Sequence, residues 1–332
     1  MRIPYEEWKP GADALATLRQ ADEICQEYRA QGFDLTLRQL YYQFVARGLI
    51  PNNQKSYKRL GDVVNRGRLA GFLDWSYIVD RTRNLRSLPH WSTPGGVIEA
   101  AASSYNRDKW AEGHTRVEVW VEKEALAGIV ERAANGDDVA WFACRGYVSQ
   151  SELWAAAQRH LGYIAAGQRV VVLHLGDHDP SGIDMTRDIE DRLTKFLDVD
   201  WMRRHLDEWA AQDEVTPGEI RAHMREHVGG DPLTVNRIAL NIDQVQAYEP
   251  PPNPAKLTDS RSSGYVREFG YESWELDALD PTMLAELIGS TIAEHRDPSY
   301  RAIARDEAEE RDGLRLAAAR WHDVTAYLGG AR

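Results

Sequence analysis

The stretch VVVLHLGDHDPSGID, residues 170–184, decides the fold class of this chain. An apolar run of strand length, residues 170–175, is followed by two acidic residues spaced one apart, Asp177 and Asp179. In open α/β sheets, functional groups collect beyond the carboxyl ends of the strands, where alternate residues of an extended Asp-x-Asp can direct oxygens at one ion. The stretch therefore predicts a buried strand that ends in a divalent-metal site.

Further strands and a helix are predicted upstream of this stretch. Residues 117–121, VEVWV, form a strand-like run that stops at Glu122, and residues 138–143, DVAWFA, form another. Between residues 150 and 163, apolar side chains recur at helical spacing. The order strand, helix, strand, helix, strand indicates an α/β fold with a mostly parallel sheet, and the first and last strands end in acids.

The acidic strand ends have two interpretations. Asp and Gly after a strand are common as turn and N-cap residues, which is the structural interpretation. Glu122, in the right order and strand context, favours a metal site instead. Oxygen ligands without a Cys or His cluster favour Mg²⁺ or Mn²⁺ over zinc. His174 and His178, which flank the pair, are expected to be solvated or hydrogen-bonded rather than ligands.

This order of strand-end acids resembles the Toprim domain, in which a strand-end Glu and a strand-end Asp-x-Asp bind magnesium in topoisomerases, primases and some nucleases. The resemblance implies Glu122, Asp177 and Asp179 as the metal ligands. Residues 145–153, RGYVSQSEL, also resemble the segment between these acids. The implied fold is Rossmann-like, with Mg²⁺ as the cofactor.

Length and composition describe an ordinary globular protein. Its 332 residues predict two domains, residues 1–95 and 96–332. The chain is 43% hydrophobic and 28% charged, has no run of 18 apolar residues, and begins MRIPYEEWKP without the features of a signal peptide. We expect a cytoplasmic protein with no membrane association. Cys25 and Cys144 each lie in an apolar-periodic segment and are expected to be buried free thiols.

Charge is distributed unevenly along the chain. The net charge is −12, yet residues 47–86 contain nine basic residues against three acidic ones. Clustered Lys and Arg are typical of a surface that binds the phosphate backbone of nucleic acid, and a solvated basic face is the alternative. The residues expected to contact DNA are Lys55, Lys58, Arg59, Arg66, Arg68, Arg81 and Arg83.

The elements of this basic module indicate a winged helix. Helices are predicted over residues 12–30, from a cap at Thr36 to residue 47, and over residues 56–70. Residues 75–82, WSYIVDRT, have the composition of a strand. Three helices followed by a strand or hairpin match a winged helix whose third helix reads the DNA groove.

The second of these helices contains two adjacent tyrosines, in LTLRQLYYQFVARG at residues 35–48. At about 100° per residue, Tyr41 shares a face with Leu40 and Phe44 and is expected in the core. Tyr42 points elsewhere, one turn after Arg38, and is expected to be exposed. A cation beside a phenol can lower its pKa and neutralise a phosphodiester, so Tyr42 is suited to nucleophilic attack on phosphate.

A winged-helix-like module with an Arg-x-x-Tyr-Tyr segment, followed by a Toprim domain, resembles the A subunit of topoisomerase VI and the related meiotic double-strand-break transesterase. The similarity covers about residues 35–197, and GDHDPSGID is close to the family's Asp-x-Asp-Pro-x-Gly segment. It implies Tyr42 as the nucleophile that forms a 5′-phosphotyrosyl link, Arg38 as its catalytic partner, and a homodimer that places the tyrosine of one protomer against the metal of the other.

The chain also departs from that family. It contains no Gly-rich P-loop, so no nucleotide is expected, and ATP-driven strand passage would need a separate ATPase subunit. In this respect it resembles the small, standalone A-subunit-like proteins of bacteria, phages and plasmids. Two other functions stay open: a metal-only hydrolytic nuclease in which Tyr42 is structural, and a non-catalytic DNA-binding or assembly module. RNA is an alternative substrate.

Several further segments carry weaker predictions. Lys123 and Arg145 are secondary candidates for phosphate contacts, although the sequence favours surface ion pairing for both. The proline-rich stretch of residues 248–264 is expected to be an extended loop, in which Lys256, Asp259 and Arg261 could order a phosphate contact or a dimer seam. Residues 300–328 are expected to form an amphipathic helix. Glu275 and Asp277 indicate either a second acidic site or a helix N-terminal acid cluster.

Overall fold

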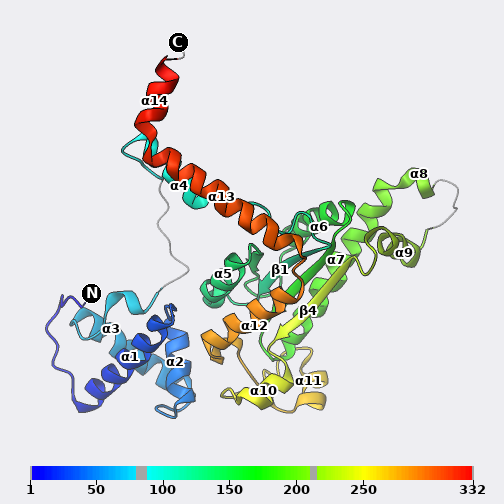
Figure 1. Cartoon of the computed structure of the whole chain (residues 1–332). Helices are drawn as coiled ribbons and strands as arrows, with labels where there is room; N and C mark the ends of the chain where they lie inside the picture. Colours follow the sequence, from blue (N-terminus) through cyan, green and yellow to red (C-terminus); the bar gives the residue numbers. More distant parts are fainter. Residues whose placement is uncertain (1, 80–87, 210–214, 331–332) are drawn as a thin grey trace.

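Four parallel strands in the order β2-β1-β3-β4 form the central sheet of the computed structural model, which describes residues 2–79, 88–209 and 215–330 (Figure 1). The strands are β1 (Thr115–Val121), β2 (Ala140–Ala143), β3 (Arg169–Leu175) and β4 (Leu233–Ala239). The predicted α/β fold and its first three strands are confirmed. β4 is not predicted from the sequence, because Asn236 and Arg237 interrupt its apolar pattern.

Helices cover both faces of this sheet. They are α5 (Ala127–Gly136), α6 (Gln150–Ala165), α7 (Pro180–Arg204), α9 (Pro217–Val228) and α12 (Pro281–Glu294). Alternate residues of a strand point to opposite faces, so Val119 and Leu173 pack in one core with α5 and α12. Trp120 and Val172 pack in the other core with α6, α7 and α9. Burial on both faces explains the continuous apolar character of β1 and β3.

The register of the two central strands brings the acidic strand ends together. Val121 pairs with Leu175, and the amide of Glu122 donates a hydrogen bond of 2.8 Å to the Leu175 carbonyl. Glu122 and Asp177 therefore leave the sheet side by side at its carboxyl edge, as expected for parallel strands.

A tight turn connects β3 to α7. The Asp179 carboxylate caps α7 by accepting hydrogen bonds from the Gly182 amide at 2.7 Å and the Ser181 hydroxyl at 2.9 Å. A Cβ atom at Gly182 would lie 2.2 Å from the carbonyl oxygen of Asp177. Only glycine fits this position, so the Asp-x-Asp-Pro-x-Gly pattern is fixed by the turn as well as by its acids.

The N-terminal region contains three helices, α1 (Ala12–Ala30), α2 (Leu37–Ala46) and α3 (Gln54–Leu69). All three confirm the prediction, within a few residues at their ends. Thr36 begins α2 through a capping box with Gln39, which supplies partners for two amides at the helix start. Figure 1 shows these helices as a group beside the sheet.

The strand predicted for residues 75–82 is wrong at its beginning. Trp75–Tyr77 form a 3₁₀ helix, η1, because the Asp74 carboxylate caps the amide of Ser76. Only Ile78 pairs with another segment, through a single parallel bridge to Leu35. Residues 80–82 lie outside the described residues. The winged-helix assignment therefore stays a prediction, as do the domain boundaries at residues 95 and 96.

The rest of the chain elaborates the sheet domain. Its remaining elements are α4 (Pro94–Ser104), η2 (Glu124–Leu126), α8 (Leu206–Trp209), α10 (Ile242–Tyr248), β5 (Asn253–Pro254), α11 (Ser262–Phe269), β6 (Glu272–Ser273), η3 (Leu276–Ala278), α13 (Ser299–Ala319) and α14 (Trp321–Gly330). The single C-terminal helix predicted for residues 300–328 is two helices that meet at Arg320. Figure 1 shows α13 and α14 projecting from the body, with α4 along α13.

The proline-rich stretch of residues 248–264 is extended only in part: residues 253–254 form β5, residues 257–261 form turns, and the stretch begins at the end of α10 and ends within α11. Its β5 strand pairs with β6, and the carbonyl of Pro252 accepts a hydrogen bond of 3.0 Å from the Asn52 side chain. This segment therefore connects the sheet domain to the loop between α2 and α3. None of the helices in the described ranges is long and apolar enough to cross a membrane.

Candidate active site

The acidic strand ends form the centre of the candidate site. The amide of Asp177 donates a hydrogen bond of 2.8 Å to Oε2 of Glu122. Beneath them lies Arg237 of β4, whose guanidinium donates to the carbonyls of Asp177 at 2.6 Å, Gly182 at 2.8 Å and Gly176 at 2.9 Å. Arg237 thus holds the β3–α7 turn that carries both aspartates.

Burial dominates the electrostatics of this centre. It raises the pKa of Glu122, and it raises the pKa of Asp177 well above its usual range. The neighbouring Glu122 carboxylate adds to the rise at Asp177, while Lys123 opposes it. Burial also lowers the pKa of Arg237 to about 10, which leaves this guanidinium charged at neutral pH. Burial and mutual repulsion thus disfavour the charged forms of Glu122 and Asp177, and a cation bound between them would stabilise both carboxylates.

Asp179 has a different role from Asp177. One of its carboxylate oxygens caps α7, and the other lies 3.9 Å from the ammonium of Lys256. Among the described residues, no group of three Asp, Glu, His or Cys side chains is arranged to hold a metal ion. The structural interpretation of Asp179 as a cap is therefore confirmed. Ligation of one ion by Glu122, Asp177 and Asp179 together stays a prediction, and Asp179 would contribute the carboxylate oxygen that does not cap α7.

Lys123 extends the site toward the N-terminal helices. Its ammonium lies 2.8 Å from Oδ1 of Asp177, 2.8 Å from Oδ1 of Asp277 and 2.9 Å from Oε2 of Glu275. Although burial opposes it, the carboxylates of Asp277, Asp177 and Glu275 hold the pKa of Lys123 above its usual value. The sequence favoured a surface ion pair for Lys123, whereas the structure places it inside this cluster. Arg145, by contrast, does form the expected surface ion pair, with Glu124 at 2.8 Å.

Arg38 and Tyr42 meet the same cluster from α2. The Arg38 guanidinium lies 2.5 Å from Oε2 of Glu275 and 3.1 Å from Oδ2 of Asp277. Tyr42 lines one pocket together with Arg38 and Glu275. Tyr42 and Asp177, 135 residues apart in the sequence, are thereby connected within one chain through Arg38, the acids of residues 275–277 and Lys123.

The prediction of an exposed Tyr42 is wrong. Tyr42 is 3% exposed, because the face of α2 that it occupies is covered by η3. Burial raises the pKa of the phenol, Glu275 and Asp277 raise it further, and Arg38 opposes them. Arg38 lowers the pKa of Tyr42, as predicted, but burial and the two acids raise it by more. Tyr41 is buried as predicted, and its hydroxyl donates to Asn52 at 2.8 Å.

A pocket of about 270 Å³ opens beside the tyrosines. Arg38, Tyr42 and Glu275 form one part of its wall, and Asn53 and Tyr57 from the start of α3 form another. Tyr42 is therefore covered by protein on most sides but borders a space that a ligand could enter.

The basic residues predicted to contact DNA fall into three groups. Lys55, Lys58 and Arg59 are exposed on α3, and Arg66 is exposed while stacking on Trp8. Arg68 is half-buried, stacks on Trp75 and donates to the Trp75 carbonyl at 2.9 Å, so its side chain is engaged within the protein and its DNA contact stays a prediction. Arg81 and Arg83 lie outside the described residues.

Sequence reasoning missed Arg237 and did not choose Glu275 and Asp277 as site residues. Arg237 lies on the strand that was not predicted, so no pattern marked it. Glu275 and Asp277 were recognised as an acidic pair; Glu275 precedes the 3₁₀ helix η3 as its N-cap, and Asp277 lies within η3. Cys25 and Cys144 are buried free thiols as predicted, and His174 and His178 are hydrogen-bonded, to Thr186 and Tyr265 respectively.

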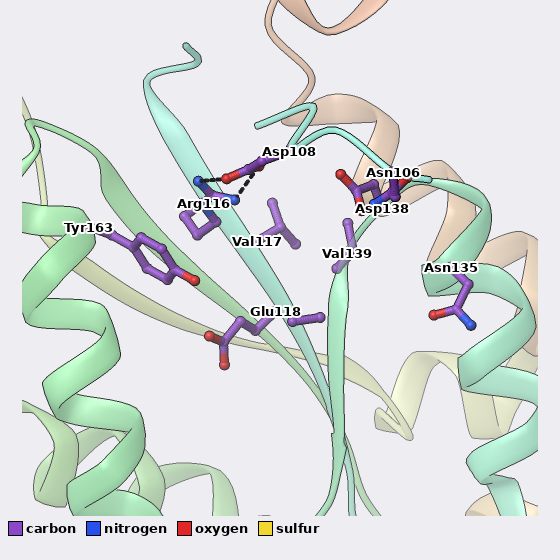
Figure 2. A pocket seen from close by; sticks show the side chains of 10 residues that line it. Asn106, Asp108, Arg116, Val117, Glu118, Asn135, Asp138, Val139 and Tyr163 are labelled. Carbon is purple, nitrogen blue, oxygen red and sulfur yellow. Dashed lines mark hydrogen bonds and ion pairs between the residues drawn. The ribbon is translucent and has the colours of Figure 1, made fainter. Parts of the chain in front are cut away.

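A second pocket, of about 520 Å³, lies at the opposite edge of the sheet, where β1 and β2 begin. Figure 2 shows the Arg116–Asp108 ion pair at its rim and Tyr163 and Glu118 along its wall. Arg116 also stacks on Tyr163, at 4.5 Å from the ring centre. Its acidic groups all have cationic partners, because Asp108 pairs with Arg116, Glu118 with Arg159 and Asp138 with Lys109. This pocket therefore does not share the strand-end chemistry of the candidate site.

Comparison of the sequence with protein-family models and with curated proteins finds no match to either. The assignment of a function therefore depends on the geometry of the site.

Proposed function

We propose that this protein is a metal-dependent, topoisomerase VI A-subunit-like transesterase that cleaves DNA through attack by Tyr42. The observation that carries the proposal is the continuous set of contacts from Tyr42 and Arg38, through Glu275 and Lys123, to Asp177. A nucleophile, two cations and strand-end carboxylates in one cluster are the groups that phosphoryl transfer requires. The winged-helix and Toprim assignments of the two regions belong to the same proposal.

The residues divide the chemistry as follows. Oη of Tyr42 forms a bond to phosphorus while the bond from phosphorus to the 3′ oxygen breaks, which gives a 5′-phosphotyrosyl link. The phenol releases one proton and the 3′ oxygen takes one up, so the reaction releases no net proton. Arg38 and Lys123 neutralise the negative charge that grows on the phosphate oxygens. The exposed Lys55, Lys58 and Arg59 hold the flanking DNA backbone.

The donor set of the site suits Mg²⁺ or Mn²⁺. Glu122 and Asp177 offer carboxylate oxygens, the ligands that these ions prefer. Carboxylates also outnumber cations in the cluster, so a bound cation would reduce the repulsion that burial magnifies. When bound, the metal would supply charge stabilisation for the phosphate and its leaving oxygen. Glu122 and Asp177 would hold it, together with the oxygen of Asp179 that does not cap α7.

The buried environment of Tyr42 favours a second candidate function. A phenol that is 3% exposed and has a raised pKa is a weak nucleophile, so water could attack the phosphate instead. The protein would then be a hydrolytic nuclease in which Tyr42 is structural. The two functions differ in one product, because only the transesterase leaves protein covalently attached to DNA. The homodimer and the separate ATPase subunit stay predictions from the family resemblance.

A plasmid assay tests the proposal. Purified protein is incubated with supercoiled plasmid and Mg²⁺ or Mn²⁺, the reaction is stopped with detergent, and half of each sample is treated with protease. We expect nicked or linear DNA that enters the gel normally only after protease treatment, and none in EDTA. Cleaved DNA that runs the same with and without protease would support the hydrolytic nuclease. Intact plasmid with both metals would overturn both candidates for the isolated chain.

Metal binding can be measured apart from cleavage. We expect Mg²⁺ to raise the melting temperature of the wild-type protein, because a ligand at about 100 times its dissociation constant stabilises the folded state by ~2.7 kcal/mol. Asp177→Asn keeps the shape of the side chain, removes its charge, and should abolish this rise. Asp191→Asn on α7 is the matched control, since Asp191 is exposed and pairs only with Arg187. An equal rise in Asp177→Asn would place the metal elsewhere.

A further inference from the structure

The cations of the candidate site converge on one carboxylate oxygen. Arg38 lies 2.5 Å and Lys123 lies 2.9 Å from Oε2 of Glu275. Tyr42 lies beside this carboxylate on the wall of the same pocket. Although burial opposes it, Lys123 and Arg38 hold the pKa of Glu275 well below its usual range. Glu275 is thus a bound anion in a cradle made of Arg38, Lys123 and Tyr42.

We propose that this cradle is the binding site for the scissile phosphate of DNA, and that Glu275 occupies it as an internal substitute which DNA must displace. The inference rests on the proposed function, because it assigns the phosphate to the position beside Tyr42. A phosphodiester carries the same single negative charge as the carboxylate, and guanidinium and ammonium groups bind either anion. An exchange of one for the other leaves the charge of the cradle unchanged.

The surroundings favour Glu275 as the group that leaves. Its side chain is 25% exposed and lies on the wall of the 270 Å³ pocket, so it can move out to solvent. The side chain of Asp277 is fully buried and contacts both Arg38 and Lys123. Asp277 would therefore keep the two cations in place after Glu275 has left, and the cradle would persist for the incoming phosphate.

The approach to the pocket suits a nucleic acid. Asn53, Gln54 and Tyr57 line it, and they belong to the cap and first turn of α3. Lys55 is exposed on the first turn of α3, and Lys58 is exposed on the second. A strand laid across the start of α3 would meet these lysines with its flanking phosphates. One phosphate could then enter the pocket and reach the cradle.

The test is DNA binding by Glu275→Gln, measured by fluorescence anisotropy with a labelled duplex and the full chain in EDTA. Glutamine keeps the size of the side chain but competes weakly for the two cations, so we expect about threefold to tenfold tighter binding than wild type. We also expect the plot of log affinity against log salt concentration to steepen by about one unit, because the freed cations now exchange solution ions for a phosphate.

The matched control is Glu272→Gln on β6. Glu272 is exposed and lies three residues before Glu275, so this variant removes the same charge outside the cradle. It should bind within about twofold of wild type and keep the wild-type salt slope. Adding Arg38→Gln to Glu275→Gln should remove the gain. If Glu275→Gln binds no tighter than Glu272→Gln while its melting curve is intact, the inference is wrong. If Glu275→Gln does not fold, the DNA affinity of Glu275→Ala is compared with that of Glu272→Gln in the same way.

This experiment separates the inference from the proposed function. Binding in EDTA requires no cleavage, so a gain in Glu275→Gln without any phosphotyrosyl product would support the cradle and reject the transesterase. Phosphotyrosyl product from the wild type, together with unchanged binding in Glu275→Gln, would support the transesterase and reject the cradle.

Discussion

Tyr42→Phe is expected to abolish the protein-linked DNA product. The substitution removes one oxygen atom, the nucleophile, and keeps the ring that packs between α2 and η3. Loss of the nucleophile in covalent catalysis lowers the rate by on the order of 10⁴-fold or more. Stability should change little in comparison, since the ring keeps its place in the hydrophobic core. The measurement is the fraction of plasmid that is trapped with protein after a detergent stop.

The neighbouring tyrosine is the natural control for this variant. Tyr41→Phe removes a hydroxyl from an equally buried ring, whose partner is Asn52 rather than the cationic cluster. It should retain most of the protein-linked product. If Tyr42→Phe still cleaves DNA while Asp177→Asn does not, Tyr42 is structural and the protein hydrolyses DNA with water. This outcome would select the second candidate function.

Arg237→Met should be the most destabilising single change in the site. The guanidinium donates to three turn carbonyls, those of Gly176, Asp177 and Gly182, and it is buried. Each buried carbonyl that loses its partner costs about 1–3 kcal/mol, so we expect a loss of about 4 kcal/mol or more in the free energy of unfolding. For a chain of this size, that loss lowers the melting temperature by roughly 10 °C.

The same substitution should also impair the metal response. The turn that Arg237 holds carries Asp177 and Asp179, so its loosening would displace the carboxylates, and Mg²⁺ should stabilise Arg237→Met less than wild type. Arg203→Met at the end of α7 is the control, because Arg203 is exposed and forms a surface ion pair with Asp200 at 3.2 Å. A melting temperature for Arg237→Met within a degree or two of Arg203→Met would contradict this role.

Local patterns in the sequence predicted much of the fold. The strands β1 and β3 and the helices α1, α2 and α6 follow from hydrophobic periodicity and caps, which depend on residues only a few positions apart. The same patterns placed Glu122 and Asp177 at neighbouring strand ends, because parallel central strands end at one edge. β4 was not predicted, because Asn236 is exposed and Arg237 binds the β3–α7 turn, so neither side chain continues the apolar pattern of a buried strand.

Tertiary structure decided the surroundings of the tyrosine and the partners of the acids. Helical periodicity separates Tyr42 from the Tyr41 face of α2, but it says nothing about what covers the other face, and here η3 covers it from more than 230 residues away. Lys123, Glu275 and Arg38 likewise meet only because three distant segments pack together. Sequence alone determined which chemical groups the strand ends and α2 present. Packing between segments determined which of those groups touch, because contacts across long loops leave no periodic signal in the chain.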